Sequence, residues 1–272
     1  MSLLENAESL LRNHRIRPKK FLGQNFMIEP CMFPRMSSYA SLSKNDTVLD
    51  IGAGMGFLTR FVAEKCGTVI AVEVDAKLAT ILRGQLADVR NVQVIEGDVF
   101  KARIPSFEKV VSIPPYSMSS RLLVWLFEKG FDCVVLVLQK EFANRLVACA
   151  GHEDYGWLTV LTFYHAEISL LDNVPRRMFY PQPEVDSAIV RLQSRRLRLA
   201  MKNETLFRPF IRALFTQRNR KVQGAVTSYL VNVRKMPAEN VKTLTSVLPF
   251  KDRRVRQLSP EDFGELACAI FE

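Results

Sequence analysis

Three short segments combine glycines and carboxylates in a way that suits a nucleoside ligand. Residues 47–59 form an apolar run that leads into glycines at 52, 54 and 56 and then into a helical pattern. Glycines allow a ligand to lie directly against main-chain amides at the start of a helix. Glu73 closes the next apolar run, 21 residues after Gly52, and Asp98 closes the third. Carboxylates at these strand ends can accept hydrogen bonds from ribose hydroxyls and from an adenine amine.

This pattern favours S-adenosylmethionine over NAD as the ligand. NAD enzymes also place a carboxylate at the second strand end, but their fingerprint puts its last glycine where this chain has Phe57. The third carboxylate, Asp98, further supports an adenosine with an accessible amine. An ordinary strand, turn and helix with acidic strand ends remains the simpler alternative.

A second segment, residues 110–116, is predicted to hold the chemistry. Pro114 and Pro115 stiffen the backbone, so main-chain carbonyls near Ile113 and Pro114 can be aimed at one point, and Tyr116 offers a flat face. Methyl transfer to an exocyclic adenine nitrogen requires acceptors for the amine protons and a fixed line of approach, rather than a strong base. A tight turn beside a core tyrosine is an equal alternative for these residues.

The net charge of +10 is unevenly distributed along the chain. Residues 176–272 hold 19 Lys and Arg against 9 Asp and Glu, whereas residues 1–175 hold 19 of each kind. A second basic cluster stands unopposed between Glu8 and Glu29. Such clusters are typical of proteins that bind polyanions, because phosphate contacts release condensed counterions. Solvated surface charge is the alternative for any single residue in them.

Length and composition indicate a folded protein with a large and a smaller domain, since 272 residues with 48% apolar content can fill a sizeable core. Five widely spaced cysteines without a CxxC pair, and only three histidines, favour buried reduced thiols and no metal site. No apolar stretch reaches the roughly 18 residues of a membrane span and no signal peptide is apparent. We therefore expect a cytoplasmic protein that does not contact membranes.

The hydrophobic pattern predicts an α/β fold. Strands are expected at 47–51, 69–74, 92–97, 109–113 and 133–138, with helices such as 76–86 and 120–129 between them. This alternation is typical of a parallel sheet covered on both faces, with ligands at the carboxyl ends of the strands. Apolar stretches at 166–171 and 187–192 are expected to complete the sheet as a hairpin-like edge. From about residue 200 the pattern is helical, and Pro237 and Pro249 divide it into short helices.

Several motifs together resemble the ribosomal RNA adenine dimethyltransferase family, which includes the erythromycin-resistance methylases. They are found at residues 19–28, 48–59, 69–75, 96–98, 155–160, 174–187 and 214–221, and so cover nearly the whole chain. The first motif and the FxPxPxVDS-type motif within 174–187 are specific, because unrelated methyltransferases lack both. The resemblance implies a Rossmann-like class I methyltransferase sheet in residues 1–197 and a small, all-helical, basic RNA-binding domain in residues 198–272.

The resemblance also implies a role for individual residues. Asn25 and the backbone at Met27 are expected to close over the methionine end of the cofactor, Gly52 and Gly54 to approach its carboxylate side, Glu73 to bind its ribose and Asp98 its adenine amine. Residues Ile113, Pro114, Pro115 and Tyr116 form the catalytic loop, Ile113 also bordering the cofactor, and Phe179 stacks on the target base opposite Tyr116. Expected RNA contacts are Arg17, Lys19, Lys20, Arg218, Arg220 and Lys221. The expected partner is small-subunit rRNA or an immature small ribosomal subunit, bound by a monomer.

One position departs from the family pattern. Aligning the family's Asn-Leu-Pro-Tyr or Asn-Pro-Pro-Tyr on Tyr116 puts Ile113 where asparagine belongs, and isoleucine has no oxygen to accept a hydrogen bond from the amine. The hydroxyl of Ser112 could replace it only if the loop shifts by a residue, because neighbouring side chains of a strand point to opposite faces. Three outcomes stay open: dimethylation with backbone carbonyls alone, slow or single methylation, or an rRNA-binding assembly factor that does not methylate.

Overall fold

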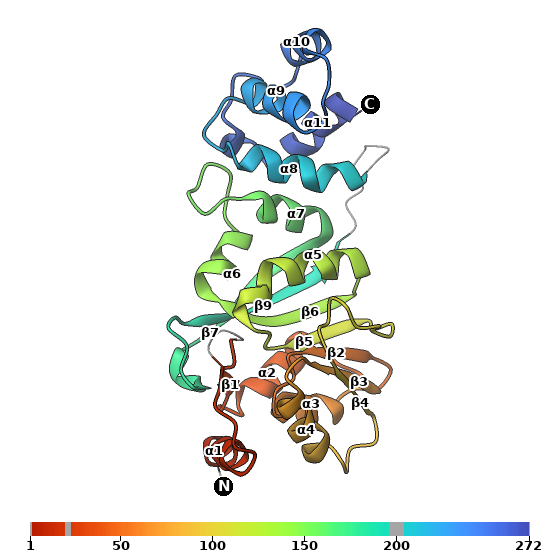
Figure 1. The fold of residues 1–272 in the computed structure, drawn as a ribbon, viewed down its shortest axis with the longest axis vertical. Helices are drawn as coiled ribbons and strands as arrows, with labels where there is room; N and C mark the ends of the chain where they lie inside the picture. Colours follow the sequence, from red (N-terminus) through yellow and green to blue (C-terminus); the bar gives the residue numbers. More distant parts are fainter. Residues whose placement is uncertain (1, 20–22, 196–203, 272) are drawn as a thin grey trace. The chain divides into compact units, whose positions relative to one another are not determined.

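The computed structural model describes residues 2–19, 23–195 and 204–271 (Figure 1). The chain forms two compact units: Met1–Ala143 with Ser169–Ser194, and Asn144–Ile168 with Arg195–Glu272. Residues 144–168 thus belong to the second unit, which the sequence pattern did not indicate. The division into domains at residue 197 stays a prediction.

The first unit contains a seven-stranded sheet in the order β4-β3-β2-β5-β6-β9-β7. Neighbouring strands from β4 to β6 are parallel, and β9 runs antiparallel to β6. All residues from Cys133 to Leu138 in β6 are buried, so both faces of the sheet are covered there. The strands are β2 (Thr47–Ile51), β3 (Thr68–Glu73), β4 (Val92–Glu96), β5 (Lys109–Ser112), β6 (Cys133–Gln139), β7 (Ala166–Val174) and β9 (Ser187–Ser194).

The five strands predicted from the apolar runs are confirmed, to within a residue or two at their ends. The two later apolar stretches, β7 and β9, also join the sheet as predicted. β9 lies between β6 and β7. The last strand in the sequence is therefore inserted inside the sheet, while β7 forms its edge.

Helices on the first unit follow from apolar spacing and local caps. The helices are α2 (Met32–Tyr39), α3 (Phe57–Ala63), α4 (Ala76–Gln85) and α5 (Ser119–Lys129). Met36 of α2 and Val62 of α3 are fully buried in one cluster with Val135 and Val137 of β6. Asp75 caps α4, since its carboxylate accepts hydrogen bonds from the first amides of that helix.

The N-terminal segment packs beside the glycine turn. Helix α1 (Leu3–Asn13) begins with a capping box between Ser2 and Glu5, and its buried Ala7 and Leu11 share a cluster with Met55 of the turn. Further along, the two-residue strand β1 (Phe26–Met27) pairs with β8 (Phe179–Tyr180). This ladder joins the first and the sixth of the family-like motifs, which lie about 150 residues apart in sequence.

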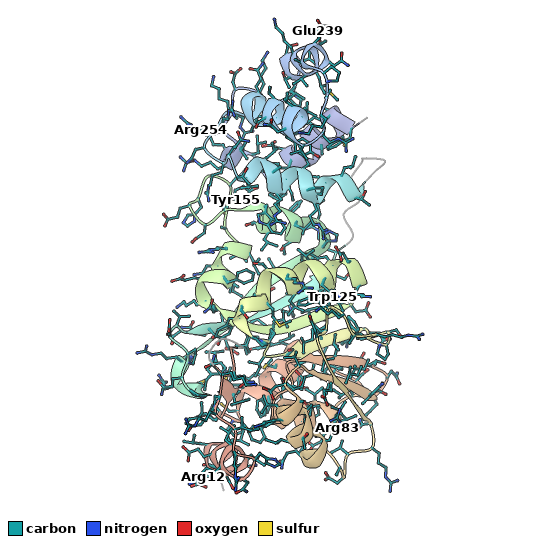
Figure 2. The ribbon with its side chains drawn as sticks, in the orientation of Figure 1. Arg12, Arg83, Trp125, Tyr155, Glu239 and Arg254 are labelled. Atoms are coloured by element: carbon teal, nitrogen blue, oxygen red, sulfur yellow. The ribbon has the colours of Figure 1, made fainter. Side chains whose placement is uncertain are left out.

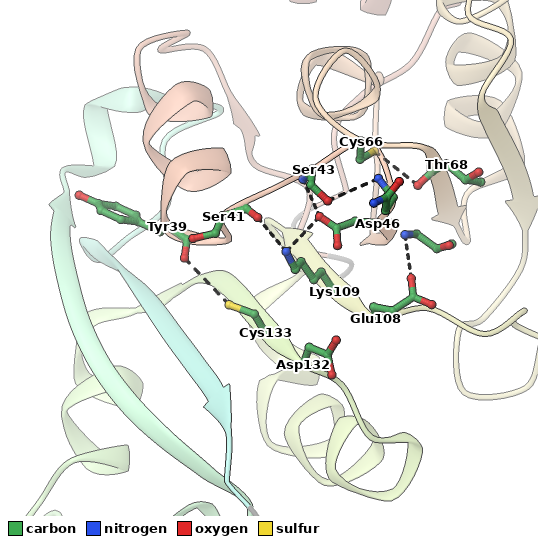
Figure 3. Close-up of polar contacts among 12 residues, drawn as sticks. Tyr39, Ser41, Ser43, Asp46, Cys66, Thr68, Glu108, Lys109, Asp132 and Cys133 are labelled. Carbon is green, nitrogen blue, oxygen red and sulfur yellow. Dashed lines mark hydrogen bonds and ion pairs between the residues drawn. The ribbon is translucent and has the colours of Figure 1, made fainter.

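The edge of the sheet at the amino ends of the strands is closed by a polar cluster (Figure 3). Lys109 at the start of β5 donates to the Ser41 carbonyl at 2.7 Å and pairs with Asp46 at 3.0 Å. Glu108 accepts a hydrogen bond from the Thr47 amide at 2.8 Å. Both members of the Lys109–Asp46 pair are largely buried, at 14% and 13% exposure. The cluster therefore ties the strand starts together.

The second unit is helical. Its helices include α7 (Trp157–His165), α8 (Phe207–Phe215), α9 (Val222–Asn232), α10 (Ala238–Ser246) and α11 (Pro260–Phe271), while α6 (Lys140–Leu146) contains residues of both units. Pro237 directly precedes α10, so the predicted break into short helices is confirmed there. An aromatic core holds this unit together. Phe215 packs on Phe263 and on Tyr155, which Figure 2 labels, and the Tyr155 hydroxyl donates to the Leu258 carbonyl at 2.9 Å.

The cysteines are all free thiols, but burial was predicted for more of them than the structure allows. Cys66 and Cys133 are buried, whereas Cys31 and Cys149 are exposed. Cys31 occupies the N-cap position of α2 without a side-chain hydrogen bond to the helix amides, and Cys149 lies exposed in the segment after α6. Among the described residues, no helix combines the length and apolar character needed to cross a bilayer.

Candidate cofactor and acceptor site

The glycine turn after β2 adopts a backbone that side chains would obstruct. Gly52 has φ +73°, and a Cβ there would lie 2.9 Å from the Cδ of Pro115. Gly54 has φ +58°, and its Cβ would lie 3.2 Å from the Phe26 ring. Both conformations lie in the left-handed region that favours glycine. The turn is thus packed between the N-terminal motif and the Pro-Pro loop.

Glu73 binds the glycine turn from the neighbouring strand. One carboxylate oxygen accepts from the Gly54 amide and the other from the Asp75 amide, both at 2.9 Å. Burial raises the pKa of Glu73, and these amide hydrogen bonds oppose the shift. The residue predicted to bind ribose therefore also fixes the shape of the turn, a role that sequence reasoning missed.

A cavity of about 380 Å³ opens at the carboxyl ends of the parallel strands. Its volume lies within the range of small-molecule sites, and its position follows the general rule for open parallel sheets. Of the residues predicted to form the site, it is lined by Asn25, Gly52, Gly54, Glu73, Asp98, Ile113 and Pro115. A smaller hollow of about 50 Å³ shares Asn25, Gly52, Gly54 and Ile113 and adds Met27.

Asp98 lies two residues after the end of β4 and lines the larger cavity. Its Oδ1 accepts a hydrogen bond from the Phe100 amide at 2.9 Å. The carboxylate is thereby oriented by its own loop and remains partly exposed to the cavity. Its other oxygen has no protein partner within the described part of the chain, so it is available to accept from a ligand.

Asp50 is a site residue that the sequence reasoning did not single out. It is 2% exposed, lines the smaller hollow beneath the glycine turn, and accepts a hydrogen bond from the Thr59 hydroxyl at 2.7 Å. Burial raises its pKa to about 7, against the Thr59 hydrogen bond, and the nearby Glu73 charge adds to the rise. The signal in the sequence was a carboxylate inside an otherwise apolar strand.

The Pro-Pro loop separates the roles of Ser112 and Ile113. The Ser112 hydroxyl is fully buried, donates to the Ile51 carbonyl at 2.6 Å and accepts from the Ile51 amide at 3.1 Å. Its proton is committed to β2, and it lines neither cavity. Ile113 lines both cavities. The loop therefore presents an apolar side chain where the family has asparagine.

Tyr116 and Phe179, the two aromatic residues predicted to stack on the target base, are both held by contacts outside the cavities. The Tyr116 hydroxyl lies 2.5 Å from the Ser187 hydroxyl, and burial raises the tyrosine pKa. Phe179 is 1% exposed, pairs with Met27 across the β1–β8 ladder and belongs to the sheet core. Neither ring lines the two cavities, and Pro114 is likewise buried outside them. Their contact with a target base stays a prediction that needs side-chain movement.

The predicted RNA contacts near the N-terminus differ in their surroundings. Lys19 pairs with the buried Asp75 at 2.7 Å, and Gln24 also donates to that carboxylate, at 3.3 Å. Lys19 thus tethers the N-terminal motif to α4. Arg17 is exposed and has no charged partner among the described residues. Lys20 lies outside the described residues.

The three predicted contacts of the second unit are already held by protein groups. Arg218 donates to the carbonyls of Glu153 and His152 at 2.8 and 3.0 Å, and no carboxylate in the described part of the chain pairs with it. Arg220 donates to Gln217 at 2.7 Å, and Lys221 pairs with Asp252 at 3.0 Å. Within the described ranges, Lys221 is the one of the three that pairs with a carboxylate.

The strand order and the cavity at the strand ends define a class I methyltransferase. A sequence profile described as ribosomal RNA adenine dimethylase matches residues 15–259, so the chain belongs to that family. It is 39% identical to a probable ribosomal RNA small subunit methyltransferase A of Methanosarcina mazei, over 98% of this chain and 97% of that protein. A protein of the same name from Thermococcus onnurineus is 37% identical, over 98% and 97%.

Two solved structures resemble the chain over most of its length. One is a dimethyladenosine transferase from Plasmodium falciparum, with a TM-score of 0.76 and 25% identity over 89% of this chain and 95% of that one. The other is the 23S rRNA methyltransferase ErmE, with a TM-score of 0.65 and 28% identity over 91% and 100%. The predicted family and fold class are therefore confirmed.

Proposed function

We propose that this protein transfers methyl groups from S-adenosylmethionine to the N6 of adenines in small-subunit rRNA, two adjacent adenines near the 3′ end, during ribosome biogenesis. The observation that carries the proposal is that the glycine turn, Glu73, Asp98 and Ile113 line one and the same cavity. Family membership and the names of the relatives support the same reaction.

The residues around the cavity fit this cofactor. Gly52 and Gly54 adopt positive φ and line the cavity, so the backbone of the turn lies at the cavity wall, and Asp98 has an acceptor oxygen to offer an adenine amine. Glu73 would hold the ribose, and Asn25 would border the methionine end. When bound, the sulfonium supplies an already activated methyl group. The protein then has only to position the acceptor.

Positioning of the target amine falls to the Pro-Pro loop. The Ser112 proton is committed to β2 and Ile113 has no side-chain acceptor, so the main-chain carbonyls at Ile113 and Pro114 are the acceptors nearest in sequence to the family's asparagine. A target adenine has to leave its helix or loop to reach the cavity, and stacking on Tyr116 or Phe179 would offset part of the unstacking cost. The amine proton can be lost to solvent after the methyl group arrives.

Methyl transfer to rRNA in immature small subunits tests the proposal. We expect labelled methyl groups on small-subunit rRNA, located and counted by mass spectrometry, and loss of the label in Asp98→Ala and Tyr116→Ala. Asp88→Ala is the matched control, because Asp88 is an exposed carboxylate away from the cavity. If the wild-type protein binds the cofactor but transfers no labelled methyl group to the rRNA, the proposal is contradicted.

A second candidate is favoured by one observation, the apolar Ile113 at the acceptor position. In this alternative the chain is an rRNA-binding assembly factor with weak or no methyltransferase activity. Calorimetric titration with S-adenosylmethionine separates the two when combined with the labelling assay. Absence of measurable cofactor binding, together with salt-sensitive rRNA binding that Asp98→Ala leaves unchanged, would favour the assembly factor.

A further inference from the structure

A strip of aromatic and basic side chains begins at the cavity wall and continues along α5. Phe100, which lines the cavity, packs edge-on against Trp125 with ring centroids 6.3 Å apart. Phe107 stacks on Trp125 at 6.1 Å. The three rings are only partly buried. We call Phe100, Phe107 and Trp125 the aromatic strip; Figure 2 labels Trp125 on α5.

Helix α5 contributes to this strip along one face. Arg121, Trp125 and Lys129 follow each other at intervals of four residues, a spacing that places side chains one above another on a helix. Leu122 and Leu126 are fully buried on the core side. Eight residues of helix rise by about 12 Å, roughly the rise of three stacked nucleotides. The face of α5 that carries Arg121, Trp125 and Lys129 is therefore not the face that packs on the core.

Cations lie directly over the rings of the aromatic strip. The Arg121 guanidinium carbon is 3.8 Å from the centroid of Phe100, and the Lys129 ammonium is 5.8 Å from that of Trp125. Neither cation has a carboxylate partner in the ranges that the structure describes. A guanidinium stacked on a ring keeps its in-plane N–H donors available for an anion. Lys101 and Arg103, both exposed, are the only charged residues between Val99 and Phe107.

Partly exposed rings, beside cations that have no carboxylate partner among the described residues, match the chemistry of single-stranded nucleic acid. Bases stack on aromatic faces without regard to sequence, and cations follow the phosphates. Helix α5 starts within three residues of Tyr116, so nucleotides next to a base held in the cavity emerge beside it. We propose that the aromatic strip and its cations bind the single-stranded rRNA that flanks the target adenine. This inference rests on the proposed function for the identity of the RNA.

Fluorescence of Trp125 tests binding without any methyl transfer. The chain has two tryptophans, so Trp157→Phe leaves Trp125 as the sole reporter. We expect a single-stranded oligoadenylate to quench this emission in a saturable manner, and an RNA duplex of equal charge to quench it much less. Equal response to both RNAs, or none to either, would overturn the proposal and leave a protein partner or plain solvent exposure.

Kinetics test whether the strip acts on the rRNA substrate. We expect Trp125→Leu to raise the KM for immature small subunits about fivefold or more, with kcat and cofactor affinity within about twofold of wild type. Lys129→Gln should weaken rRNA binding and reduce the slope of log K against log salt by about 0.7. Lys65→Gln is its matched control, since Lys65 lies 5.5 Å from Phe61 in the same kind of contact but away from the cavity.

The outcomes separate this inference from the proposed function. An unchanged KM in Trp125→Leu, beside normal methylation by the wild-type protein, would overturn the strip and leave the methyltransferase assignment intact. Equal effects of Lys65→Gln and Lys129→Gln on rRNA binding would show that Lys129 contributes only general surface charge, and would contradict a specific site at the aromatic strip. If wild type does not methylate rRNA, the fluorescence titration still decides whether the strip binds single-stranded RNA.

Discussion

At the scale of single residues, Ser112 and Ile113 are adjacent in the chain and have opposite surroundings. The Ser112 hydroxyl holds β5 to β2 through the main chain of Ile51, while Ile113 borders both cavities. Alternation of side chains along a strand explains this, since only one of two neighbours can face the cavity. The possibility that Ser112 replaces the family's asparagine therefore requires breaking two buried hydrogen bonds.

We expect Ile113→Asn to change the rate of methyl transfer by less than about tenfold, because main-chain carbonyls already provide acceptors for the amine. The measurement is single-turnover methylation of small-subunit rRNA at saturating cofactor, with Ile113→Val as the control for altered side-chain shape. A rise of about tenfold or more, equivalent to about 1.4 kcal/mol of barrier, would show that the native loop lacks an oriented acceptor.

Asp50 should make the stability of the protein depend on pH. Its pKa is raised to about 7 in the folded protein from a reference value of 3.8, so the folded state binds the extra proton between these values. Stability therefore falls as pH rises from about 4 to 7. Relative to Asp50→Asn, the wild type should lose about 2 kcal/mol between pH 5 and 7, measured by urea unfolding. Asp88→Asn, at an exposed site, should show no such difference.

At the scale of elements, the two edges of the parallel sheet have different tasks. The carboxyl ends of β2, β3 and β4 meet at the cavity, whereas the amino ends of β2 and β5 are joined by Lys109 and Asp46. Burial pushes the pKa of Asp46 upward, but hydrogen bonds from Lys109 and Ser43 outweigh it and lower the pKa overall. The stabilisation from this carboxylate is thus present above its unfolded pKa and lost in acid.

We expect Lys109→Met to destabilise the protein by about 1–3 kcal/mol, because it leaves the Asp46 carboxylate largely buried without its cation. Thermal and urea unfolding measure this loss. Affinity for S-adenosylmethionine at a temperature where the variant is folded should stay within about twofold of wild type. Lys44→Met, an exposed lysine that donates to the Glu64 carbonyl, is the control. A selective loss of cofactor affinity would contradict the separation of the two edges.

At the scale of the whole molecule, the excess charge resides in the C-terminal part of the chain, yet its basic residues are not equivalent. Arg218 donates to two main-chain carbonyls and pairs with no carboxylate among the described residues, while Lys221 pairs with Asp252. Counterion release depends on charge that is free to meet phosphate. The number of basic residues therefore overstates the number of phosphate contacts that the second unit can make.

We expect Arg218→Gln to weaken rRNA binding more than Lys221→Gln does, and to reduce the slope of log K against log salt by about 0.7–0.9. Filter binding across a salt series measures both effects. Thermal unfolding of each variant controls for the hydrogen bonds from Arg218 to the loop at Glu153. If Lys221→Gln weakens rRNA binding more than Arg218→Gln does, the prediction is contradicted, and Lys221 exchanges its ion pair with Asp252 for a phosphate contact.

The amino-acid sequence alone determined the features that depend on local pattern. Val- and Ile-rich runs predicted β2 to β6, and glycines followed by a helical pattern predicted the turn before α3. Carboxylates at successive strand ends predicted that Glu73 and Asp98 share one cavity, because parallel strands bring their carboxyl ends to a common edge. The sequence motifs predicted the family, because each motif is a short run of residues that can be recognised without the fold.

Tertiary structure decided the features that join distant parts of the chain. Ser112 and Ile51 are 61 residues apart, and the register of β5 beside β2 alone makes them partners. Likewise, Glu73 holds the Gly54 amide, and Phe179 is buried by the β1–β8 ladder. Residue type and spacing limit which side chains can form a contact, but strand register and packing decide which contacts form. Strand register and packing between distant segments leave no periodic pattern in the sequence from which they could be predicted.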